Sequence, residues 1–94
     1  MNIFRYLSFS QEKAKRLYEN PSHETSWQSR DVKAHKFGGA IRLSPIILSF
    51  SGLSETANEA LMIFVAYYAN WIDKKEAIRL GEISQNRYIK NILD

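Results

Sequence analysis

The chain of 94 residues contains no cysteine, only four glycines and only two prolines. Without cysteine it can form neither a disulfide framework nor a thiolate site, and we expect it in a reducing compartment, the cytoplasm. The scarcity of glycine and proline, together with 45% hydrophobic residues, excludes a wholly disordered chain. The sequence therefore predicts a single small domain that spans residues 1–94.

Long hydrophobic runs are also missing. The longest uncharged run, residues 60–72, is shorter than the roughly 17 residues that a helix needs to cross a bilayer. The first residues lack the basic region, the long apolar run and the cleavage site of a secretory signal. We therefore expect no membrane partner.

Motifs of enzymes and metal proteins are absent from the sequence as well. It has no glycine-rich phosphate loop, no HExxH, no nucleophile elbow and no paired carboxylates in an apolar setting. Neither His23 nor His35 has a neighbour at the spacing of a metal ligand. We expect neither catalysis nor a metal or cofactor.

The first twenty residues carry apolar side chains at helical spacing. Asn20-Pro21 ends this pattern, because proline has no amide to donate and restricts the residue before it. We expect a helix that ends near residue 19 and begins either near residue 2 or at Phe9. Its outer face is expected to carry Lys13, Lys15 and Arg16.

Two adjacent glycines, Gly38 and Gly39, stand between segments in which apolar and polar residues alternate weakly. A turn at these glycines would place Lys33, His35 and Arg42 on one face. A slip of one residue would scramble both faces, which favours this register. We expect a basic β-hairpin around Gly38-Gly39.

The middle of the sequence predicts a long apolar helix. The run at residues 46–54 is typical of a short strand or an apolar linker, and Ser54 followed by Glu55 predicts a helix start. From Ala57 to Ile72 the apolar residues follow helical spacing and surround the middle of the helix. Such a helix is buried on all sides, either by the rest of the chain or by a second copy in a homodimer.

The end of the sequence predicts a helix, a tight turn and a second helix. Gly81 is a natural helix stop, because glycine adopts the left-handed conformation at low cost. Ser84 is a good N-cap for the next helix, and Ile83 with Tyr88 has the spacing of a hydrophobic staple. We expect the last helix over residues 85–93.

The segment KKEAIRLGEISQNRYIK, residues 74–90, resembles the helix-turn-helix of many bacterial and phage regulators. Ala77 and Gly81 match the spacing of that family, and LGEISQ resembles its turn. Glu82 stands where the family usually has an apolar residue, and Ile83 comes one position late. The resemblance implies that the last helix enters the major groove of DNA.

A helix in the major groove would read bases with its first turn. Arginine pairs with guanine, and asparagine or glutamine pairs with adenine. The basic hairpin would contact phosphate in the manner of a wing. The predicted DNA-binding residues are Lys33, His35, Arg42, Ser84, Gln85, Asn86, Arg87 and Lys90.

A surplus of basic residues, which favours a polyanionic partner, is found only in the first half of the chain. Residues 1–47 hold eight Lys or Arg against four Asp or Glu, whereas residues 48–94 hold five against six. The leading hypothesis is a small α+β regulator or accessory protein that binds double-stranded DNA as a homodimer.

A purely structural explanation of residues 74–93 and a different function both compete with DNA binding. A helix corner without any role in DNA recognition is the commoner explanation of residues 74–93. The alternative function is that of a small inhibitor, immunity-type or adaptor protein, which acts by occupying the surface of a partner protein.

Overall fold

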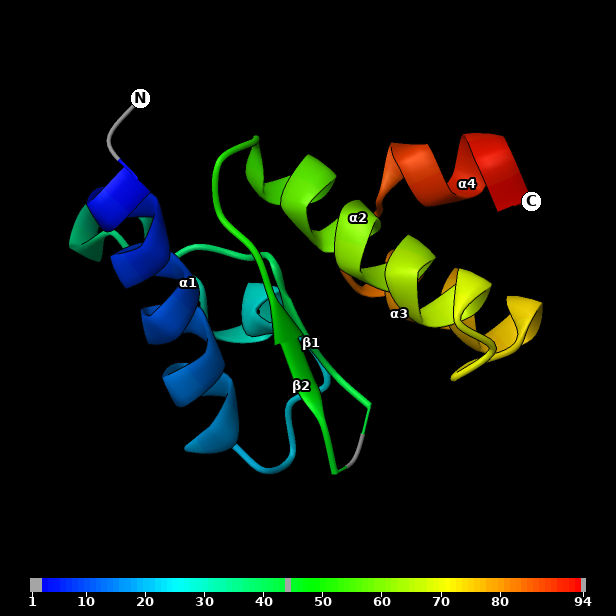
Figure 1. Cartoon of the computed structure of the whole chain (residues 1–94), viewed down its shortest axis with the longest axis horizontal. Helices are drawn as coiled ribbons and strands as arrows, with labels where there is room; N and C mark the ends of the chain where they lie inside the picture. Colours follow the sequence, from blue (N-terminus) through cyan, green and yellow to red (C-terminus); the bar gives the residue numbers. More distant parts are fainter. Residues whose placement is uncertain (1–2, 44, 94) are drawn as a thin grey trace.

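Four helices and a two-stranded antiparallel sheet make up the part of the chain that the structure describes, residues 3–43 and 45–93 of a computed structural model (Figure 1). The helices are α1 (Ile3–Tyr18), α2 (Glu55–Tyr68), α3 (Lys74–Ile83) and α4 (Arg87–Leu93). The strands are β1 (Ala40–Arg42) and β2 (Ile47–Ser49), and two 3-10 turns, η1 (Ser26–Ser29) and η2 (Val32–Ala34), precede them. The predicted α+β class is confirmed.

The hairpin of β1 and β2 lies between α1 and α2, each of which contacts both strands (Figure 1). Helices α3 and α4 pack on α2 and on each other. No helix of the described part is long and apolar enough to cross a membrane. The buried core joins the hairpin to the last three helices through Ile41, Ala60, Met62, Ile63, Ala66, Ala77, Leu80, Ile89 and Leu93.

Helix α1 begins at Ile3 and ends at Tyr18, so its predicted end is confirmed and the alternative start at Phe9 is wrong; residue 2 lies outside the described residues. The predicted outer face is wrong for two of its three cations. Lys15 is exposed, but Lys13 and Arg16 are buried, with 1% and 8% of their surface accessible. Apolar contact along their stems and acceptors for their charged ends make this burial tolerable.

A hairpin exists, but the one predicted around Gly38-Gly39 is wrong, because residues 32–34 form η2 and not a strand. Ala40 pairs with Ser49 and Arg42 with Ile47, so the connection lies at residues 43–46. Across it, the amide of Leu43 donates to the carbonyl of Ile46 at 2.7 Å. Of the two alternatives for the segment after Pro45, a short strand or an apolar linker, the strand is confirmed as β2.

Gly38 and Gly39 allow the backbone to pass close to other parts of the chain. A Cβ at Gly38 would lie 2.8 Å from Cε3 of Trp27, and one at Gly39 would lie 2.8 Å from Nζ of Lys13. Gly39 also has φ +127°, which favours glycine. These glycines therefore serve tertiary packing rather than a hairpin turn.

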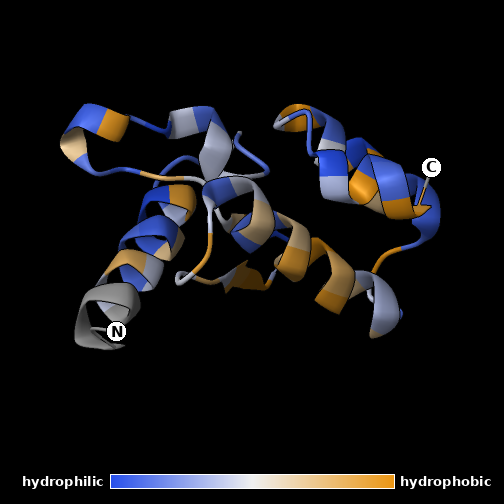
Figure 2. Cartoon of the chain, turned by 90° about the horizontal axis from the view of Figure 1, so that it is seen from above, coloured by the Kyte–Doolittle hydropathy of each residue, from blue (hydrophilic) through white to orange (hydrophobic). Residues whose placement is uncertain are grey.

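Helix α2 begins as predicted, since Oγ of Ser54 accepts the amide of Ala57 at 3.3 Å. The first alternative, burial on all sides by the rest of the chain, is wrong, and burial by a second copy stays a prediction. Leu61, Val65 and Tyr68, spaced by four and three residues, form an exposed stripe along one face. Figure 2 shows apolar residues along much of α2.

One ionisable group of α2 lies inside the protein. The side chain of Glu59 is fully buried, and neither carboxylate oxygen has a hydrogen-bond partner among the described residues. Burial raises the pKa of this carboxyl to about 8, and the nearby hydroxyls of Ser84 and Thr25 offset only part of that shift. Glu59 is therefore protonated at neutral pH.

The junction of α3 and α4 differs from the prediction. Helix α3 continues through Gly81 to Ile83, and the left-handed residue is Gln85, with φ 51°. The amide of Gln85 donates to the carbonyl of Glu82 at 3.1 Å and that of Asn86 to Gly81 at 2.8 Å, which is a Schellman cap. Gly81 is needed for another reason: a Cβ there would lie 2.8 Å from Cγ2 of Ile89.

Candidate functional site

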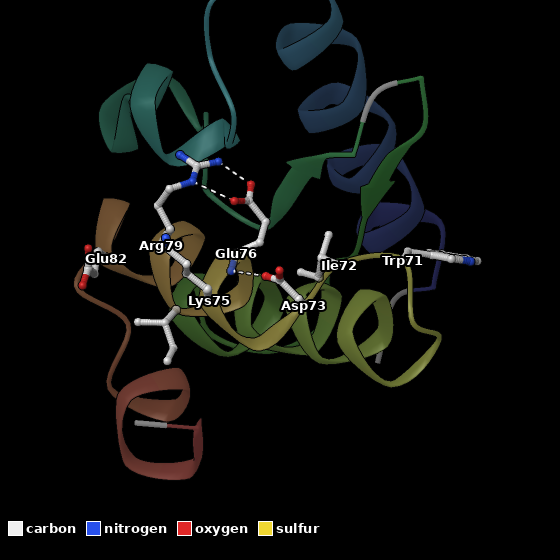
Figure 3. A pocket seen from close by; sticks show the side chains of 8 residues that line it. Trp71, Ile72, Asp73, Lys75, Glu76, Arg79 and Glu82 are labelled. Atoms are coloured by element: carbon white, nitrogen blue, oxygen red, sulfur yellow. Dashed lines mark hydrogen bonds and ion pairs between the residues drawn. The ribbon is translucent and has the colours of Figure 1, made fainter.

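An open groove of about 700 Å³ runs along the outer side of α3 (Figure 3). Its lining combines apolar side chains with charged ones. The lining residues are Trp71, Ile72, Asp73, Lys75, Glu76, Ile78, Arg79 and Glu82. Figure 3 shows Trp71 at one end of the groove and Glu82 at the other, with Arg79 and Glu76 between them.

Trp71 owes its position to the end of α2. Asn70 adopts the left-handed conformation, with φ 61°, and its amide donates to the carbonyl of Tyr67 at 3.0 Å. The amide of Trp71 donates to the carbonyl of Ala66 at 2.9 Å and completes a second Schellman cap. The cap fixes the backbone at Trp71, while 55% of the residue remains exposed and its ring points away from α3 (Figure 3).

The polar wall of the groove is an ion-pair network centred on Arg79. Its two terminal nitrogens donate to the two carboxylate oxygens of Glu24, both at 2.6 Å, and its Nε donates to Glu76 at 2.9 Å. Hydrogen bonds from the guanidinium lower the pKa of Glu24 and are the main reason that the pKa of Arg79 is raised. The network holds α3 against the segment before η1 and keeps the carboxylate of Glu24 charged.

A smaller cavity of about 180 Å³ lies between α3 and α4. Ile78 and Glu82 line both this cavity and the groove, so the two are adjacent. The smaller cavity brings in Ile89 and Lys90 of α4. The lining of the groove and of the smaller cavity is here called the α3 groove, and it extends from Trp71 to α4.

The structure places the five DNA-binding residues predicted near α4 in different settings. Gln85, Arg87 and Lys90 are exposed, whereas Ser84 and Asn86 are buried. The prediction that Ser84 is an N-cap is wrong, since it closes the C-terminus of α3 and α4 begins at residue 87.

Asn86 takes the capping role that was predicted for Ser84. Its Oδ1 accepts the amide of Tyr88 at 3.2 Å, and its Nδ2 donates to the carbonyl of Thr56 at 2.7 Å. The asparagine amide therefore fastens the turn to the start of α2. The predicted staple of Ile83 and Tyr88 is wrong as well, because it required Ser84 at the cap.

The three cations predicted on the hairpin lie apart from α4. Lys33 and His35 are exposed on η2 and at its end, and Figure 1 shows this segment at the opposite end of the longest axis from α4. Arg42 is on β1 and donates to the carbonyls of Leu17 at 2.5 Å and His23 at 3.0 Å. Its guanidinium closes the C-terminal end of α1.

Sequence reasoning missed the groove, although one signal for it exists. Asparagine is the commonest residue after glycine at a left-handed helix end, so Asn70 after an apolar helix indicates a cap with Trp71 directly beyond it. No comparable signal exists for Arg79, because its partner Glu24 is 55 residues away in the sequence. Within residues 3–43 and 45–93 no cluster of His, Asp or Glu could hold a metal ion.

The fold and the α3 groove define a small α+β protein with an open, partly apolar groove on its surface. A scan of protein-family models, a search of curated proteins and a search of solved structures each found no match to this chain.

Proposed function

We propose that this chain is a protein-binding module that receives a segment of a partner protein in the α3 groove. The observation that carries the proposal is the position of Trp71, an exposed indole on a fixed backbone at the end of a groove with apolar residues in its lining. Tryptophan is enriched among the residues that dominate binding energy at protein interfaces.

The groove suits a partner segment with both apolar and polar side chains. Ile72 and Ile78 offer apolar contact, and Lys75 and Glu82 offer a charge of each sign. The Arg79 guanidinium is already paired with two carboxylates within the chain, so it needs no anionic group from the partner. Covering the exposed part of Trp71 would contribute on the order of 2–3 kcal/mol, judged from the apolar area of an indole.

Site-specific photo-crosslinking in the native cells tests this proposal. A photoreactive amino acid is placed in the groove at Lys75 or at Glu82, and a matched control position is the exposed Val32 on η2. We expect one protein to be linked from both groove positions and not from residue 32. Trp71→Ala should weaken its binding by about 30-fold, which corresponds to roughly 2 kcal/mol.

Two results would contradict this assignment. The first is a link from residue 32 that is as strong as the links from the groove. The second is binding that Trp71→Ala leaves unchanged while circular dichroism shows an intact fold.

DNA binding is the second candidate, and the exposure of Gln85, Arg87 and Lys90 beside a helix-turn-helix-like junction supports it. Within the described part of the chain, neither Arg87 nor Lys90 forms an ion pair, so both cations are available to phosphate or bases.

Fluorescence anisotropy with a pool of short duplexes at about 50 and 200 mM salt tests DNA binding. Sequence-selective binding that survives the higher salt and is lost in Arg87→Ala, but not in Lys33→Ala, would support a reading role for α4. Absence of binding at both salt concentrations would exclude this candidate.

A further inference from the structure

A second cavity, far from the α3 groove in sequence, lies between α1, the segment after β2 and the start of α2. Its volume is about 290 Å³ and its surface is mostly apolar. Phe9, Phe37 and Leu53 provide the apolar walls, and Lys13, Glu55 and Asn58 provide the polar groups. A mostly apolar cavity with a few convergent polar groups is the usual form of a small-molecule site.

The walls of this cavity are held by contacts within the protein. The rings of Phe9 and Phe37 meet edge to face, with centroids 5.6 Å apart. Nδ2 of Asn58 donates to the carbonyl of Leu53 at 3.1 Å, and Oδ1 accepts the amide of the same residue at 3.0 Å. The cavity is therefore largely formed before any ligand arrives.

The charges around the cavity do not balance. Glu12 pairs with Arg16 at 3.1 Å, and Arg30 pairs with Glu55 at 2.6 Å. Lys13 forms no ion pair with any described carboxylate, and its ammonium has one hydrogen bond, to the carbonyl of Phe50 at 2.7 Å.

An ammonium has three donors, so Lys13 is a buried cation whose neighbouring charges are already paired. Burial lowers the pKa of Lys13 to about 8, and the charge of nearby Glu55, which is paired with Arg30, offsets only part of that shift. At neutral pH most of these side chains still carry a proton.

We propose that the cavity binds a small organic anion with an apolar body, of the class of arylalkyl carboxylates. The carboxylate pairs with the Lys13 ammonium, and the apolar body packs between Phe9, Phe37 and Leu53. The volume admits about 10 to 12 non-hydrogen atoms, at the lower end of the usual range for ligand pockets. This inference is independent of the proposed role of the α3 groove.

A matched pair of probes tests the proposal on the unmodified chain. The probes are 3-phenylpropionate and its uncharged analogue 3-phenylpropionamide, titrated at about pH 6.5 while amide nitrogen and proton shifts are recorded. We expect saturable shifts at Phe37 and Leu53, a Kd in the millimolar range for so small a molecule, and binding of the amide weaker by about tenfold. Equal affinities, saturable shifts confined to other residues, or no saturation by about 20 mM would overturn the proposal.

Two substitutions on one helix then identify the cation. Lys13→Met should remove the preference for the carboxylate, so that both probes bind with the same affinity, whereas Lys15→Met removes an exposed cation and should change nothing. If both variants keep the preference, the assignment to Lys13 is wrong. If Lys13→Met does not fold, Leu53→Trp, which fills the cavity from an exposed position, should abolish binding of both probes.

Discussion

The buried carboxyl of Glu59 should make the protein less stable as the pH rises from acid to neutral. Its pKa is about 8 in the folded chain and 4.5 in the unfolded chain, so between these values the folded state holds a proton that the unfolded state releases. Its contribution to stability is therefore fully present below about pH 4.5 and is lost as the pH rises towards 8.

The size of this effect follows from the shift. At 1.36 kcal/mol for each unit, the loss between pH 4.5 and pH 7 is on the order of 3 kcal/mol, a large part of the stability of so small a domain. Glu55 and Glu24 do not mask it, because their pKa values are lowered and they titrate below this window. Above pH 8 the lowered pKa of Lys13 acts in the opposite direction, so stability should recover as the pH approaches 10.5.

Urea denaturation of the wild type and of Glu59→Gln at pH 5, 6, 7 and 8 measures this dependence. Glutamine keeps the size and polarity of the protonated acid and cannot ionise, so the variant should match the wild type near pH 5 and exceed it by on the order of 3 kcal/mol at pH 7. Glu82→Gln, an exposed change on α3, is the control and should leave the wild-type slope intact. A wild-type stability that is flat or rising between pH 5 and pH 8 would refute the reasoning.

Three further substitutions test other parts of the fold. Gly81→Ala should lower the free energy of unfolding by about 1–3 kcal/mol in urea denaturation, because the Cβ of the alanine would lie 2.8 Å from Ile89. An unchanged midpoint of denaturation would contradict the close packing of α3 and α4. Gln85→Gly should raise it by about 0.5–1 kcal/mol, since glycine adopts φ 51° without strain; a loss of stability would show that the side chain matters more than the backbone. The exposed stripe of α2 is the surface through which the predicted homodimer can form. The double variant Leu61→Glu, Val65→Glu should therefore convert a dimer to a monomer in sedimentation velocity. A wild type that is monomeric at all concentrations would exclude this dimer.

Local chemistry was sufficient to predict where α1 ends and where α2 begins. Asn20-Pro21 ends α1 because proline cannot continue a helix, and Ser54 starts α2 because its hydroxyl accepts a free amide of the first turn. These effects act over three or four residues, so they can be read without knowledge of the fold. The β part of the predicted α+β class rested on a hairpin around Gly38-Gly39, so the class is confirmed although the strands that pair are different ones.

Tertiary structure decided what the glycines and the cations do. A glycine can supply a left-handed turn or make room for a neighbour, and the sequence around Gly81 or Gly38-Gly39 is compatible with both. Only the positions of Ile89 and Trp27, brought close by folding, select the second role. Lys13 was expected on the outer face of its helix, but the carbonyl of Phe50, 37 residues away in the chain, lies beside it in the fold and accepts its hydrogen bond. Distant acceptors of this kind make the burial of a charge tolerable, and their arrangement exists only after the chain has folded.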